Sequence, residues 1–95
     1  VNLDVIVDYR EDLDKVIGIL AGVAAGIAAD SPVSQFITEG PSVLGVESIA
    51  GKAVTIRIIA QTEPFKDPEV ARELRKRIAT ALSAEKIELG DAAVE

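Results

Sequence analysis

The 95-residue chain has no cysteine and no histidine. The first absence excludes disulfide bonds and thiol nucleophiles, and the second excludes imidazole as a general acid or base. Both residue types are also the usual ligands of structural zinc. The serines have neither a histidine partner nor an elbow motif, and the chain has no glycine-rich phosphate loop. We therefore predict no catalytic residue, no metal site and no cofactor.

Aromatic residues and long hydrophobic runs are scarce as well. Aromatic residues make up 3% of the chain, against 48% for all hydrophobic residues, so this one small domain must have an aliphatic core. The charge-free stretch from Val16 to Ala29 has 14 residues. Because a helix needs about 20 residues to cross a bilayer, we do not expect a transmembrane segment here.

The chain has fewer basic residues than acidic ones. The formal net charge is −6, because 16 acidic residues outnumber 10 basic ones. Residues 1–48 account for the whole imbalance, with eight acids and two bases. Contacts to phosphate need a positive surface, so the acidic balance argues against nucleic-acid binding. The chain begins at Val1, with no methionine and no basic leader, which indicates a fragment of a longer protein.

Apolar residues recur along the chain with two different periods. A period of two predicts strands at 2–9 and within a hairpin at 43–60, whose two strands meet at a glycine turn at 49–52. The segment 30–41 is rich in turn residues and is predicted to be a linker. A short strand at 87–89 is expected to be the last element.

Two helices complete the predicted pattern. Apolar residues three and four apart predict a helix over 12–29, and Asp67, as cap, with Pro68 predicts the start of a second helix. The order strand, helix, strand, strand, helix, strand predicts an α+β fold: a ferredoxin-like βαββαβ sandwich with a four-stranded antiparallel sheet and two helices on one face. We expect this domain to span residues 1–90, followed by a flexible tail at 91–95.

The first predicted helix is unusual on the face opposite its apolar stripe. Gly18, Gly22 and Gly26 are four residues apart there, and Ala25 and Ala29 flank them. Each glycine inside a helix costs about 1 kcal/mol of stability relative to alanine. One interpretation is a subunit-packing surface, where small residues let another backbone approach closely. The other is a solvent face that tolerates glycine.

Two charged clusters also have alternative interpretations. The acids between residues 4 and 14 lack the glycine-bearing loop of a calcium site, so we interpret them as a favourable helix start and a solvated strand face. The basic run at 72–77 is interpreted as a solvated face that pairs with nearby acids. Phosphates, an acidic membrane surface and the acidic half of an adjacent copy are the alternatives for that run.

Three segments together resemble one known family. They are VNLDVIVDYREDLDKVIGIL at 1–20, PSVLGVESIAGKAVTIRIIAQTEP at 41–64 and EVARELRKRIATALSAEKIEL at 69–89. In this order they resemble the cytosolic C-terminal α/β domain of the small-conductance mechanosensitive ion channel family, where a strand ending in tyrosine, here Tyr9, precedes an aspartate and a helix. The family's Pro-aromatic-Pro segment after the last strand is absent, since Gly90 and Asp91 follow Leu89.

The resemblance implies a parent protein that is a homo-oligomer, a heptamer in this family, in the plasma membrane of a prokaryote. Bilayer tension would open the parent's pore as an osmotic response. This domain would lie on the cytoplasmic side, where it helps to build a vestibule, packs against neighbouring subunits and filters ions and solutes. Its partners would be other copies and other domains of the same chain. The resemblance implies no nucleic acid, no small-molecule substrate, and neither pore nor catalysis in this fragment.

The predicted fold also leaves an alternative open. Ferredoxin-like pairs often serve as regulatory modules that bind a small-molecule effector at a dimer interface, and a fold does not determine a function.

Overall fold

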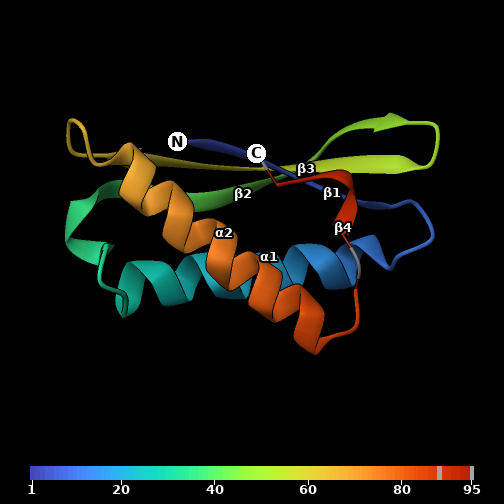
Figure 1. Cartoon of the computed structure of the whole chain (residues 1–95), viewed down its shortest axis with the longest axis horizontal. Coiled ribbons are helices and arrows are strands. Elements are labelled where there is room, and N and C mark those ends of the chain that lie inside the picture. The colour runs from blue at the N-terminus through green and yellow to red at the C-terminus, as the bar shows by residue number, and fades with distance from the viewer. Residues whose placement is uncertain (88, 95) are drawn as a thin grey trace.

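The structure is a computed structural model that describes the backbone of residues 1–87 and 89–94 and the side chains of residues 1–87. The chain alternates between strands and helices along its length (Figure 1). In chain order the elements are β1 (Asn2–Asp8), α1 (Leu13–Ala29), the short 3-10 helix η1 (Ser34–Phe36), β2 (Ile37–Ala50), β3 (Ala53–Thr62), α2 (Asp67–Ala84) and β4 (Leu89–Val94).

Both helices lie on one face of an antiparallel sheet, and no other described element covers the opposite face (Figure 1). The strand order is β2-β3-β1-β4. The β1–β3 register runs without a break from Asn2↔Ile59 to Asp8↔Ala53, whereas β4 is paired with β1 at Val7↔Leu89 and Val5↔Val94 with a register shift between these pairs. The helices and the central strands β2, β3 and β1 confirm the predicted α+β class.

The core is aliphatic, as the scarcity of aromatic residues predicts. Alternate residues of β1 and β3 are buried, and one stripe of each helix packs against them. The buried cluster consists of Leu3, Val5, Val7, Val16, Leu20, Ile27, Val33, Val54, Ile56, Ile58, Val70, Leu74, Ile78, Leu82 and Ile87. Full burial of one such side chain stabilises a fold by roughly 1.5–3 kcal/mol. Because these stripes face the sheet, the opposite faces of α1 and α2 point outward.

Strand β2 is longer than the sequence predicts, since it begins at Ile37 and not near residue 43. Its register to β3 shifts at four places, which lets it accommodate residues that normally interrupt strands. Gly40 shows why glycine is needed there: its φ is +85°, and a Cβ would lie 3.1 Å from the carbonyl oxygen of Ile59. The predicted hairpin turn is confirmed as Gly51-Lys52, where Gly51 has a φ of +60°.

Helix α2 starts one residue earlier than the sequence predicts. The sequence predicts Asp67 as the cap, but Asp67 is the first helical residue, and Lys66 occupies the cap position without a side-chain hydrogen bond. The physical reason is the turn before the helix. The amide of Lys66 donates to the carbonyl of Glu63 at 3.1 Å, so Lys66 closes that turn and the helix starts directly after it.

The last strand also differs from the prediction, since β4 spans Leu89–Val94 and not 87–89. Helix α2 ends in a glycine-free Schellman motif: Lys86 has a φ of +60°, and the amide of Ile87 donates to the carbonyl of Leu82 at 2.9 Å. This motif occupies the chain through residue 87 and delays the strand. Residues 91–94 of the predicted tail carry strand backbone, while their flexibility stays a prediction and residue 95 lies outside the described residues.

Candidate functional site

The outward face of α1 carries most of the small residues that the sequence singles out. Gly18, Gly22, Ala25 and Ala29 are all exposed. Apart from the adjacent residues and the helix's own nearby backbone, no described atom lies within 4 Å of the position that a Cβ would take at Gly18 or Gly22. Since α1 has no charged residue after Lys15, this face is uncharged over its last four turns. It can therefore receive another backbone without desolvating a charge.

Gly26 has a different environment from the other two glycines. It is half-buried, and a Cβ there would lie 3.6 Å from Nη1 of Arg77 on α2. The structure therefore separates the predicted ridge into two parts. Gly18 and Gly22 face outward, whereas Gly26 lies beside the Arg77 guanidinium of α2.

Arg77 ties the two helices together. Its Nε donates to Oε2 of Glu73 at 2.8 Å, and its Nη2 donates to the backbone carbonyl of Asp30 at 3.1 Å. Asp30 is the C-terminal cap residue of α1, so the guanidinium supplies a donor where helix carbonyls lack intrahelical partners. The positive charge also lies at the negative end of the α1 dipole.

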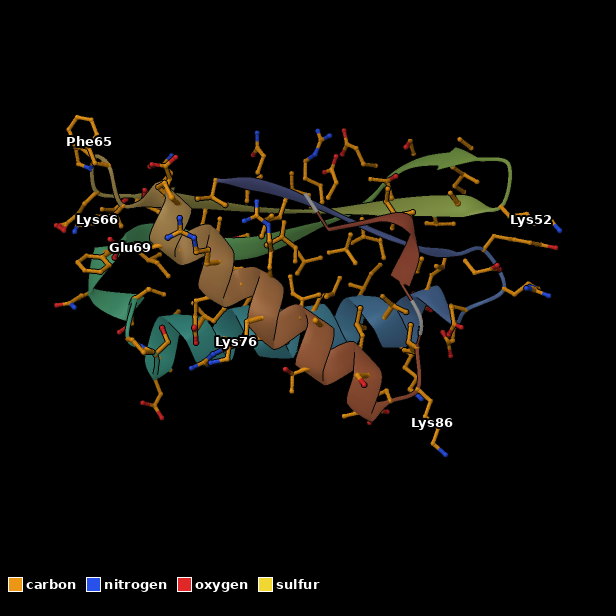
Figure 2. All side chains as sticks on the ribbon, in the orientation of Figure 1. Lys52, Phe65, Lys66, Glu69, Lys76 and Lys86 are labelled. Carbon is orange, nitrogen blue, oxygen red and sulfur yellow. The ribbon has the colours of Figure 1, made fainter. Side chains whose placement is uncertain are left out.

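The basic side chains at 72–77 on α2 lie in two different environments. Arg77 is half-buried and paired, as described above, whereas Arg72, Arg75 and Lys76 are exposed. Within residues 1–87, none of these three has a carboxylate within ion-pair distance. Lys76 projects from the middle of α2 (Figure 2). The predicted pairing with nearby acids thus holds for Arg77 but not for these three side chains.

The acids near the N-terminus are dispersed among separate partners. Asp12 caps α1, because its Oδ1 accepts a hydrogen bond from the amide of Lys15 at 3.2 Å. Asp8 binds Arg10, which lies two residues further along the chain. In the part of the chain whose side chains are described, no cluster of acidic side chains has the arrangement of a metal site.

The uncovered sheet face has its own ion-pair network, centred on Arg57 of β3. Arg57 Nε donates to Asp4 Oδ1 of β1 at 2.9 Å, and Nη1 donates to Glu47 Oε1 of β2 at 3.2 Å. The hydrogen bond from Arg57, followed by its positive charge, lowers the pKa of the Asp4 carboxyl below its usual value, although partial burial opposes this shift. The network therefore joins three strands through one side chain.

The roles of Arg57 and Arg77 were not predicted from the sequence. For Arg57, a signal was available: it alternates with the buried residues of its strand, and the other strands of the predicted sheet carry acids. For Arg77, the helix period alone could not show the contact with Asp30, because that contact depends on how α1 and α2 cross.

These features define a domain with an uncharged helix face, a basic helix face and an ion-paired sheet face. Among the described residues, neither helix has the length and hydropathy that a bilayer crossing requires. The notable features of the described part are thus these three surfaces.

A comparison with models of known protein families shows to which family the chain belongs. The model for the C-terminal domain of the mechanosensitive ion channel MscS matches residues 1–89. The chain belongs to this family of mechanosensitive channel domains, which is an ion-channel family and not a known enzyme family. Membership implies a parent channel that is embedded in a membrane and oligomeric, and it does not favour the small-molecule regulatory alternative. No curated protein matches the chain.

Proposed function

We propose that this chain is a cytosolic, vestibule-forming domain of a tension-gated channel and that it packs against neighbouring subunits through the outward face of α1. The observation that carries the proposal is the exposed, uncharged surface at Gly18, Gly22, Ala25 and Ala29 in a family of oligomeric channels. Two exposed glycines cost roughly 2 kcal/mol of helix stability, at about 1 kcal/mol each relative to alanine. Close approach of another subunit would offset that cost.

The fold of the domain and the location and symmetry of the parent channel follow from the same proposal. The domain would be a ferredoxin-like sandwich completed by β4, on the cytoplasmic side of the plasma membrane, in a homo-heptamer. The observed strand order β2-β3-β1-β4 supports this fold. Surface charge would then bias which ions reach the pore, because a field of one sign raises the local concentration of the opposite charge.

Gly26 has a different proposed role from the residues of the outward face. A Cβ at Gly26 would be in ordinary van der Waals contact with the Arg77 guanidinium, so this position lies against its own subunit. We propose that Gly26 sets the spacing of α1 and α2 and thereby the shape of the interface that the outward face presents.

Substitution of Gly22 tests the proposed surface. Leucine at this exposed helical position should leave the fold intact, because no described atom beyond the adjacent residues and the helix's own nearby backbone lies within 4 Å of its Cβ. The same side chain should keep a neighbouring backbone away and reduce the oligomeric mass of the full-length channel, measured by light scattering in detergent. Ala79→Leu, at an exposed position of α2, is the matched control and should leave the mass unchanged. An unchanged mass for Gly22→Leu would refute the proposed surface.

A further inference from the structure

Large hydrophobic side chains are exposed where β2 and β3 meet, at a surface that we call the hairpin end: Tyr9, Val46, Ile49 and Lys52. All three of its apolar side chains are exposed. Tyr9 belongs to this surface because its amide donates to the carbonyl of Lys52 at 2.9 Å. Phe65 is also exposed, but it lies at the opposite end of the molecule from Lys52 (Figure 2). The hairpin end is therefore an apolar surface of its own.

Val46 and Ile49 lie on the face of the sheet that the helices cover. Val46 is paired with Ile56 and Ile49 with Val54, and both partners are fully buried. Opposed residues of an antiparallel pair share one face of the sheet. Nevertheless, Val46 and Ile49 are 42% and 64% exposed, and the hairpin end extends past both helices (Figure 1). The subunit thus leaves part of its own apolar sheet face uncovered, as interaction surfaces do.

The outward face of α1 has the chemistry that suits this surface. A partner that covers apolar side chains should itself be uncharged, because burying an unpaired charge is costly. Of the three surfaces described above, only the outward face of α1 meets this condition, since it has no charge after Lys15. Its small residues, such as Gly22 and Ala25, offer little apolar area but permit close approach. The large side chains of the hairpin end supply the apolar area that this face lacks.

The charges that border the two surfaces are of opposite sign. Lys52 is exposed and projects from the hairpin end (Figure 2), and Asp30 is exposed directly after the last turn of α1. Within residues 1–87, Lys52 has no carboxylate and Asp30 no cation within ion-pair distance. The charge of Arg77, near Asp30, is balanced by Glu73. The last turn of α1 has no basic residue, and the C-terminal end of a helix attracts cations.

We infer that the hairpin end of one copy packs against the C-terminal half of the outward face of α1 in a second copy, with Ile49 over Ala25 and Lys52 facing Asp30. The hairpin end and the C-terminal end of α1 lie at opposite ends of the molecule, so the contact joins copies head to tail (Figure 1). Such a heterologous contact closes into a ring when the rotation between subunits allows it. The inference rests on the proposed function and names the partner of the α1 surface.

Disulfide formation in the full-length channel tests this contact. Two cysteines can be linked only when their Cα atoms lie within about 7 Å. In a channel otherwise free of cysteine, Ile49→Cys together with Ala25→Cys should link copies into covalent dimers and longer chains on mild oxidation. Ile49→Cys with Ala79→Cys, at an exposed position of α2, is the matched control and should give no links. No links from an intact oligomer, or equal links from Ile49→Cys alone, would overturn the inference.

A charge exchange in the same two-cysteine channel tests the pair of Lys52 and Asp30. Lys52→Glu should reduce the yield of linked copies severalfold, because it places two acids together, and adding Asp30→Lys should restore the yield. Lys86→Glu changes another exposed lysine by the same charge and should leave the yield unaltered. An undiminished yield for Lys52→Glu, or a loss that Asp30→Lys does not restore, would contradict this pairing.

The mass of the channel separates failure of this inference from failure of the proposed function. If Gly22→Leu reduces the oligomeric mass while the cysteines at 25 and 49 do not link, another surface covers α1, and only the hairpin end is wrong as its partner. A monomeric mass for the unaltered channel would refute the proposed function as well.

Discussion

Among the side chains of residues 1–87, that of Arg57 joins the most elements on the uncovered sheet face. Its bonds to Asp4 and Glu47 link β3 to both neighbouring strands. Fully exposed ion pairs contribute little to stability, but the Arg57 side chain is only about one-third exposed. Its guanidinium group also contacts the Asp4 carboxylate through two nitrogens. We therefore expect the pair with Asp4 to make a measurable contribution.

This pair gives the domain a predictable response to acid. Because Arg57 lowers the pKa of Asp4 in the folded state, the contribution is fully present above the pKa of the unfolded carboxyl, about 3.9. It is lost as the pH falls through the lower folded-state pKa. Asp4→Asn should therefore reduce the free energy of unfolding at pH 7, and the difference from the unaltered protein should shrink below pH 4.

Urea unfolding at pH 7 and near pH 3 measures this effect. Glu39→Gln is a suitable control, because Glu39 is exposed and forms no ion pair within residues 1–87. A difference between Asp4→Asn and the unaltered protein that stays constant across this range would show that ionisation of Asp4 does not stabilise the fold.

At the scale of elements, helix α1 was the most predictable part of the chain. Its apolar stripe predicted the buried face, and the charge-free segment after Lys15 predicted the bare outward face. The environment of Gly26 was not predictable, because helical periodicity places residues around one axis but does not show where a second helix crosses. The unexpected length of β2 has a similar cause: bulges let glycine and proline enter a strand, and pairing with β3 determines where those bulges form.

Arg77 connects α2 to the C-terminal end of α1 through the carbonyl of Asp30. Arg77→Ala should lower the free energy of unfolding by about 1–2 kcal/mol, because it removes two hydrogen bonds and leaves the half-buried Glu73 without its partner. Lys76→Ala removes an exposed cation from the same helix and should change stability by less than about 0.5 kcal/mol. Thermal or urea unfolding would compare the two variants. Equal losses would contradict a specific tie between the helices.

At the scale of the whole molecule, the core and the proposed functional surfaces occupy different faces. Composition and periodicity were sufficient to predict the aliphatic core and the α+β class, because burial drives both. The resemblance carried by three segments of the chain predicted the channel family, which the match over residues 1–89 confirms. The exposed ring of Phe65 was not predictable from periodicity, since a loop residue has no periodic neighbours to compare with.

The absence of cysteine makes the central claim directly measurable. A single cysteine in place of Gly22 would lie on the outward face of α1, where it would be the only thiol in this chain. If subunits pack through this face, a maleimide should label that thiol rapidly in the isolated 95-residue chain and at least tenfold more slowly in the assembled full-length channel. A cysteine in place of exposed Ala79 on α2 controls for general access. Equal labelling rates at position 22 in the two samples would contradict the account.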